Sequence, residues 1–124
     1  MFEILNIVAA IVTLGLGIYG LSLPQKAAQL VRLEATDMEG FSEFRASFGG
    51  LWIGLGAVPL ITMEPLAFAM AGVIWLSAAI GRGVSFALDK TITRQNMINV
   101  CFEVACGAFL LIGTPWLALT SQSV

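Results

Sequence analysis

The stretch Ile4–Leu23, ILNIVAAIVTLGLGIYGLSL, decides the fold, because it runs for 20 residues without one charged side chain. An α-helix of about 20 predominantly apolar residues is long enough to cross the hydrocarbon core of a bilayer. Glu3 stands before the stretch in place of a basic residue, and no small-residue cleavage pattern follows it, so a signal peptide is not indicated. We therefore expect a first membrane helix over residues 3–23.

The composition of the whole chain is also that of an integral membrane protein. Of the 124 residues, 58% are hydrophobic and only 11% are charged, whereas soluble domains have about 25% charged residues. Mean hydropathy is +0.91. A chain of this length fits a single domain over residues 1–124, and its first partner is expected to be the lipid bilayer.

The charged and titratable residues argue against several classes of function. The net charge is −2 and no run of basic residues is present, so nucleic acid is not an expected partner. Histidine, the commonest metal ligand and the commonest general base near neutral pH, is absent. We therefore expect no metal, no cofactor and no enzymatic activity.

Three further apolar stretches continue the pattern of the first. They predict membrane helices over residues 41–63, 65–88 and 96–119. Short connections separate them, so neighbouring helices should run in opposite directions. The predicted fold class is an all-α membrane protein, a four-transmembrane-helix antiparallel bundle. Pro115 is expected to end or kink the last helix, and Trp116 suits an outer interfacial belt.

The longest connection follows the first helix and contains a short apolar pattern among charged residues. Its apolar members are Ala27, Leu30, Val31 and Leu33. Such a pattern predicts a short interfacial amphipathic turn after helix one.

The basic residues of the connections predict the orientation in the membrane. They are Lys26 and Arg32 in the first connection and Lys90 and Arg94 in the third, with none in the second. Connections rich in lysine and arginine remain in the cytoplasm. We therefore expect a multi-pass protein with both termini outside.

Small residues recur at helical spacing in the second and third helices. The residues predicted to pack helices closely are Ala46, Gly49, Gly50, Gly54, Gly56 and Gly81. In lipid, small residues about four apart allow two helix backbones to approach closely. The second helix, which carries most of them, is the expected centre of the bundle.

Four charged residues lie within or at the ends of the predicted helices, at similar depth in the membrane. They are Glu43, Arg45, Arg82 and Glu103. Charges in the bilayer usually face the protein interior and pair, so Glu103 is expected to bind an arginine, Arg82 in the first place and Arg45 in the second. The arginines can instead extend to the membrane surface. A neutral cluster of this kind is either a structural clasp or the polar floor of a cytoplasm-facing pocket.

Several of these stretches together resemble a bacterial family of four-helix membrane proteins described as a domain of unknown function. The most specific stretch is E-x-R-A-x-x-G-G, here Glu43 to Gly50, followed by Gly81-Arg82 and by Glu103. The resemblance covers nearly the whole chain. It implies the four-helix layout and the polar cluster, but no activity, substrate or cofactor. We expect the chain to lie in the bacterial cytoplasmic (inner) membrane.

Three functions are compatible with these features. The first is a non-enzymatic structural or accessory membrane subunit that binds a membrane-protein partner or further copies of itself. The second is binding or transport of a small amphiphile or weak acid at a cytoplasm-facing polar pocket, with Arg45 or Arg82 as the cation. The third, an intramembrane enzyme, would depend on Glu103 alone as an acid or base.

Overall fold

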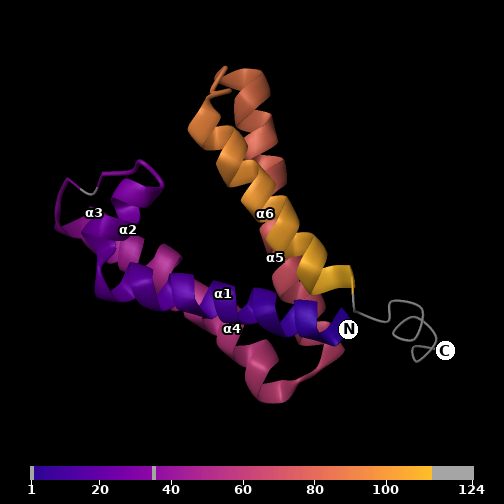
Figure 1. Ribbon diagram of the computed structural model, residues 1–124. Helices are drawn as coiled ribbons and strands as arrows, with labels where there is room; N and C mark the ends of the chain where they lie inside the picture. The colour runs from indigo at the N-terminus through magenta and orange to yellow at the C-terminus, as the bar shows by residue number, and fades with distance from the viewer. Residues whose placement is uncertain (1, 35, 113–124) are drawn as a thin grey trace. The chain divides into compact units, whose positions relative to one another are not determined.

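The computed structural model describes residues 2–34 and 36–112, and within these ranges all regular structure is helical (Figure 1). The helices are α1 (Phe2–Ser22), α2 (Pro24–Leu30), α3 (Met38–Phe44), the π-helical segment η1 (Arg45–Gly50), α4 (Leu51–Thr62), α5 (Pro65–Leu88) and α6 (Arg94–Ile112). Pro115, Trp116 and the predicted end of the last helix lie outside the described residues.

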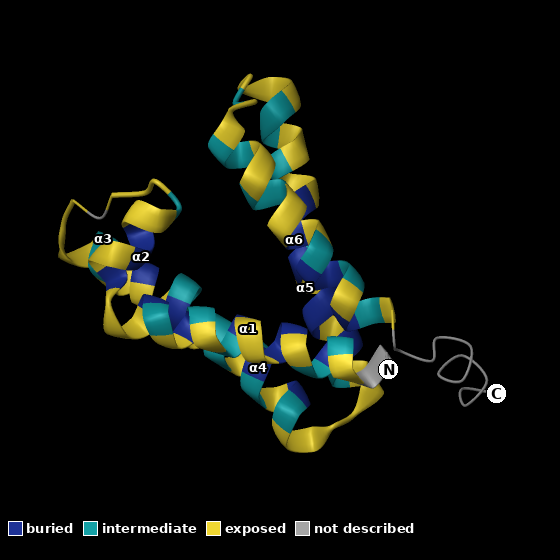
Figure 2. Cartoon of the chain, viewed as in Figure 1, coloured by how far each residue is buried: buried dark blue, intermediate teal, exposed yellow. Residues whose placement is uncertain are grey.

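Four helical stretches are long and apolar enough to cross a membrane, as the sequence predicts. They are Ile4–Ser22, Met38–Thr62, Pro65–Leu88 and Arg94–Ile112. The second of them joins α3, η1 and α4 into one continuous helical run. Large apolar side chains remain exposed along these stretches, for example Ile61 at 80% and Ile80 at 69% (Figure 2). A lipid-facing surface accounts for exposed apolar side chains of this kind.

Local sequence explains where the helices begin and end. Pro24 cannot donate a backbone hydrogen bond, so α1 ends just before it and α2 begins with it. The Asp37 carboxylate caps α3 by accepting a hydrogen bond of 2.7 Å from the Gly40 amide. At the start of α6, the Thr93 hydroxyl accepts a hydrogen bond of 3.1 Å from the backbone amide of Asn96. The short helix α2 occupies the connection in which the sequence predicts an amphipathic turn.

The described chain divides into two compact units, which are described separately. One contains α5, α6 and the part of α1 up to Ala9, and the other runs from Ala10 to Thr62. The single domain expected from chain length remains a prediction.

In the unit from Ala10 to Thr62, the rest of α1 packs closely against η1 and α4. A Cβ atom added at Gly17 would lie 2.5 Å from the Ile53 amide nitrogen, and one at Gly56 would lie 2.5 Å from that of Leu14. Real Cβ atoms do not approach so closely. Since the residue numbers in the contacts fall on one helix as they rise on the other, the two helices run antiparallel.

The other unit is built on an antiparallel hairpin of α5 and α6 (Figure 1). Gly72 and Gly107 bring the two backbones together, since an added Cβ on either would lie 3.0–3.1 Å from the carbonyl oxygen of the other. Trp75 packs edge-on against Phe102, with ring centroids 5.6 Å apart. From α1, the buried Asn6 amide donates hydrogen bonds to the Phe109 and Leu110 carbonyls of α6, at 2.6 and 3.0 Å.

Candidate functional site

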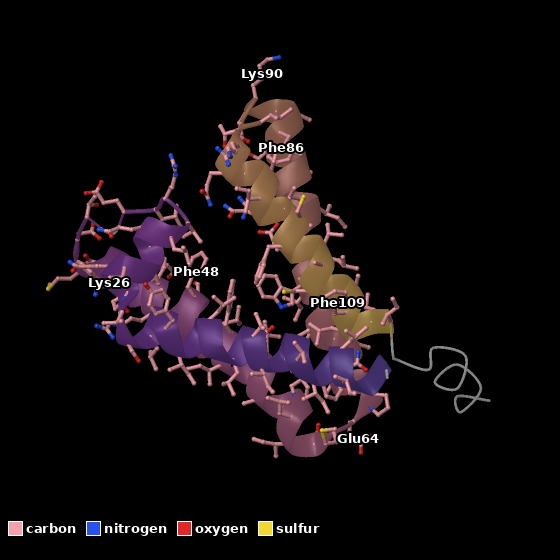
Figure 3. All side chains as sticks on the ribbon, viewed as in Figure 1. Lys26, Phe48, Glu64, Phe86, Lys90 and Phe109 are labelled. Carbon is pink, nitrogen blue, oxygen red and sulfur yellow. The ribbon has the colours of Figure 1, made fainter. Side chains whose placement is uncertain are left out.

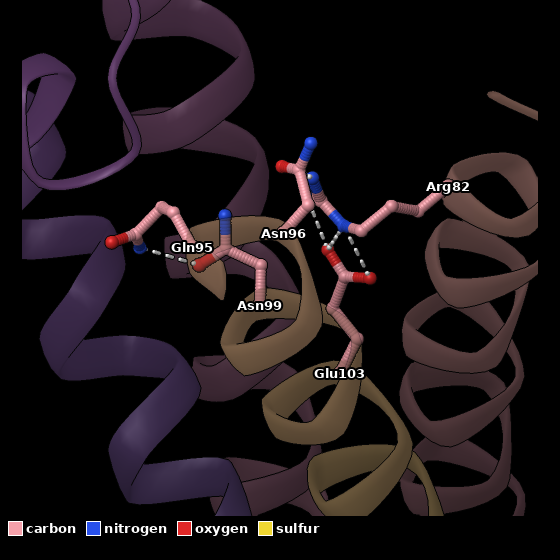
Figure 4. A network of polar contacts seen from close by, with 5 residues as sticks. All are labelled: Arg82, Gln95, Asn96, Asn99 and Glu103. Carbon is pink, nitrogen blue, oxygen red and sulfur yellow. Dashed lines mark hydrogen bonds and ion pairs between the residues drawn. The ribbon is translucent and has the colours of Figure 1, made fainter. Parts of the chain in front are cut away.

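An ion pair joins the two helices of the hairpin near its loop. The guanidinium of Arg82 on α5 donates three hydrogen bonds to the carboxylate of Glu103 on α6 (Figure 4). The Nη2–Oε1 distance is 2.5 Å, and Nε lies 3.1 Å from both carboxylate oxygens. This geometry confirms the pairing of Glu103 with Arg82 that the sequence predicts.

The antiparallel hairpin explains why these two residues meet. Residues 89–93 connect the helices, so the last turns of α5 lie beside the first turns of α6. The Glu103 side chain is 9% exposed and that of Arg82 is 28% exposed. A carboxylate with so little access to solvent destabilises the fold when it is unpaired, because it loses its hydration. An arginine that donates several hydrogen bonds to it compensates this loss.

A hydrogen-bond network extends from this pair to the loop between α5 and α6. Arg82 Nη1 donates to the Asn96 side-chain oxygen at 3.2 Å, and the Asn96 side-chain nitrogen donates to the Thr91 carbonyl at 2.8 Å. The Thr91 hydroxyl lies 2.9 Å from that of Ser85, which in turn donates to the Asp89 carboxylate at 3.0 Å. Asn96 therefore fixes the free side of the guanidinium and ties the ion pair to the loop.

A second pair of polar side chains lies on α6 beside the ion pair. The Gln95 side-chain nitrogen donates to the Asn99 side-chain oxygen at 3.1 Å. In Figure 4 this amide pair extends to the side of α6 away from Arg82. Both side chains are partly exposed.

The other two predicted site residues, Glu43 and Arg45, have partners within their own unit. Arg45 Nη1 donates to the Leu21 carbonyl at the end of α1, which is one of the carbonyls that a helix end leaves without a backbone donor. Glu43 accepts a hydrogen bond of 2.9 Å from the Ser47 hydroxyl, one turn along the same helix. The grouping of all four charges into one site remains a prediction.

The E-x-R-A-x-x-G-G stretch contains a π-helical turn where the sequence predicts a regular α-helix. The turn covers Arg45–Gly50, and the Leu51 amide donates to the Ala46 carbonyl, five residues back instead of four. Such wide turns are rare and occur frequently at functional sites. No hydropathy pattern indicates one, so the sequence analysis missed it.

Aromatic side chains line this wide turn. Phe44 stacks on Phe48 with centroids 4.5 Å apart, and Phe48 contacts Trp52 at 5.8 Å. The buried Phe44 packs with Ala27 and Ala28 of α2. The turn therefore fixes α2 against the membrane span as well as binding the end of α1.

The six small residues predicted to pack helices differ in what surrounds them. A Cβ at Gly49 would lie 2.9 Å from the Leu21 Cα, and Gly56 is equally confined. Gly50 has one neighbouring atom at 4.0 Å, whereas Gly54 and Gly81 have nothing within 4 Å. Ala46 is exposed. Close packing within the described units thus involves Gly49 and Gly56, and the predicted packing role of Gly50, Gly54 and Gly81 is not seen there.

Comparison with known protein families identifies the family of this chain. Residues 1–114 match the sequence model of the family described as "Domain of unknown function (DUF4345)". The chain belongs to the DUF4345 family. The match includes every helix that the structure describes, and therefore both the wide turn and the ion pair of this DUF4345 chain. No curated protein and no solved structure matches the chain.

The chemistry available to the DUF4345 site follows from its hydrogen bonds. Both carboxylate oxygens of Glu103 already accept from Arg82, and the guanidinium is held further by Asn96. Within residues 2–34 and 36–112, no group of three or more His, Cys, Asp or Glu side chains could hold a metal ion. We call this ion pair a closed contact between α5 and α6, because both carboxylate oxygens already accept hydrogen bonds from Arg82.

Proposed function

We propose that this protein is a non-enzymatic structural or accessory subunit of the bacterial cytoplasmic membrane, which it crosses four times as an antiparallel bundle. The observation that carries the proposal is the closed contact between Arg82 and Glu103, in which the carboxylate accepts three hydrogen bonds from one arginine. A group that is fully engaged inside the fold is suited to holding helices together and not to acid–base chemistry.

Purification from native membranes tests this role. With an affinity tag on the full chain and a mild detergent, we expect recovery of one larger complex with a fixed stoichiometry. Native mass spectrometry would then give the masses of the components. Recovery of the chain alone, at several detergent concentrations, would contradict an accessory role.

Binding of a small amphiphile or weak acid is the second candidate, and Arg45 is the observation that favours it. Its side chain is exposed, and the bond that the structure gives it goes to a neutral backbone carbonyl. Its charge therefore remains available to an anionic group. Bound lipid or weak acid that is lost in Arg45→Gln, but retained in the matched surface variant Arg94→Gln, would support this function.

The proposed orientation places both termini outside and the loop between α5 and α6 in the cytoplasm. The support for it is the position of Lys26, Arg32, Lys90 and Arg94 in the first and third connections. Figure 3 shows Lys90 and Glu64 at opposite ends of α5, so these two positions report on opposite faces of the membrane.

Cysteine labelling provides the measurement. In a Cys101→Ala, Cys106→Ala background, we expect Lys90→Cys to react with an impermeant maleimide only after the cytoplasmic face is opened. Glu64→Cys should react in intact cells. The reverse pattern would show the opposite orientation.

A further inference from the structure

Two basic residues, Lys26 and Arg45, lie where the first membrane span stops. Arg45 belongs to the second span, Met38–Thr62, but its guanidinium donates to the Leu21 carbonyl, next to the last residue of α1. Lys26 follows directly in α2, and Figure 3 shows it beside the end of α1. Contacts within the unit Ala10–Thr62 therefore hold both charges at the level where the first span meets the membrane surface.

The packing of α2 brings the two basic residues to one place in this unit. Ala27, the neighbour of Lys26 in the chain, is buried against Phe44, the neighbour of Arg45. The two cations therefore flank a single contact between α2 and the second span.

Neither cation has a charged partner within this unit. Over residues 10–34 and 36–62, no lysine or arginine forms an ion pair with a carboxylate. Arg45 uses one N–H group for the neutral Leu21 carbonyl, and its other N–H groups make no hydrogen bond to the described residues of the unit. Cations at membrane depth are expected to bind a group of opposite charge.

The carboxylates that the structure describes in the other unit offer one alternative partner. Glu103 is already engaged by Arg82. Glu64 lies at the end of α5 away from its loop to α6, so the proposed orientation places it on the membrane face opposite to α2 (Figure 3). Asp89 lies in that loop, on the same face as α2, and accepts a hydrogen bond from Ser85. The experiment must therefore exclude Asp89.

We propose that Lys26 and Arg45 together bind the phosphate of an anionic phospholipid in the cytoplasmic leaflet. A phospholipid carries its phosphate at this level and extends its acyl chains along the apolar helices. The planar guanidinium presents paired N–H groups that match phosphate oxygens, and the lysine ammonium adds a second positive charge. Basic residues beside a membrane helix attract anionic lipids in this way. The inference rests on the second candidate function, binding of a small amphiphile, and names that amphiphile as a phospholipid.

The test is native mass spectrometry of the full chain in mild detergent, with phosphatidylglycerol or phosphatidylcholine added over a range of concentrations. We expect phosphatidylglycerol to remain bound to wild type, with an affinity roughly fivefold lower in Lys26→Gln and in Arg45→Gln. Phosphatidylcholine should bind more weakly, because its headgroup carries its own cation. Glycerol phosphate should not compete, because it lacks the acyl chains; competition by it would show a site for a soluble phosphate and overturn the inference.

Arg32→Gln is the matched control, because Arg32 lies in the same connection but beyond the other end of α2. It should retain the wild-type affinity. An equal loss in Arg32→Gln would show a diffuse electrostatic attraction and overturn the inference. Circular dichroism verifies folding, and Lys26→Gln decides the matter if Arg45→Gln does not fold, since Lys26 makes no side-chain hydrogen bond to the described residues.

The remaining outcomes separate the inference from the proposed function. A coupling free energy between Arg45→Gln and Asp89→Asn in unfolding would identify a carboxylate of the chain as the partner and overturn the inference. A weak acid that is bound in place of lipid and lost in Arg45→Gln would overturn the phospholipid but support the second candidate function. Equal retention of phosphatidylglycerol by wild type, Lys26→Gln and Arg45→Gln would overturn the inference and leave the accessory role unaffected.

Discussion

Glu103→Gln is expected to lower the free energy of unfolding in detergent by about 2 kcal/mol, because it leaves the guanidinium of Arg82 without a carboxylate partner. Arg82 is 28% exposed, so water reduces the loss below that of a fully buried pair. Arg82→Gln should cost a similar amount. The double variant should cost less than the sum of the two, with a coupling free energy of about 1 kcal/mol.

Thermal or denaturant unfolding of the two single variants and the double variant measures this coupling. Arg94→Gln, which removes an exposed arginine from the start of α6, is the matched control and should add to Glu103→Gln without coupling. The exchange of Arg82→Glu with Glu103→Arg should recover part of the stability. Strictly additive losses for Arg82 and Glu103 would show that the pair does not hold the hairpin.

Gly56→Leu is expected to have the second large effect, because it inserts a side chain where α1 and α4 are in contact. The first added atom would lie 2.5 Å from the Leu14 nitrogen and 2.7 Å from the Ala10 carbonyl oxygen. Backbone atoms cannot move aside as a flexible side chain can, so we expect a loss of about 3 kcal/mol or failure to fold. Gly56→Ala should give a smaller loss that remains measurable.

Gly54 provides the matched control on the same helix. An added Cβ there meets nothing within 4 Å. Gly54→Leu should therefore change the free energy of unfolding by no more than about 0.5 kcal/mol. Both variants should be compared by thermal unfolding in one detergent. Equal destabilisation by the two would mean that the face of Gly54 packs against protein as tightly as that of Gly56.

The membrane helices and the ion pair were predictable from sequence for definite physical reasons. A bilayer requires about 20 apolar residues per crossing, so hydropathy and length alone locate the four stretches. Proline and charge fix the ends, and the predicted third helix, 65–88, coincides with α5. The short loop after α5 makes an encounter between Arg82 and Glu103 a consequence of chain connectivity.

Other contacts could not be predicted, because the sequence carries no signal for them. Arg45 binds a backbone carbonyl, and every residue has one, so composition cannot identify Leu21 as the partner. The wide turn at Arg45–Gly50 also changes which residues share a helix face, since a regular spacing continued through it misaligns the positions on either side. Nor does small size alone show which face of a helix is packed, since Gly50 and Gly54 have open surroundings like the exposed Ala46, whereas Gly49 and Gly56 contact α1.

Because of the wide turn, the second membrane span contains one residue more than a regular α-helix that presents α3 and α4 on the same faces. Its amide bond reaches five residues back, from Leu51 to Ala46, so removal of one residue between them would restore the ordinary four-residue step. In an ordinary helix a deletion turns everything beyond it by about 100°. Here α3 and α4 would keep their faces, and only the extra loop of backbone would be lost. The segment Arg45–Gly50 is therefore the part of this span at which evolution can shorten the chain without rotating the helices it connects.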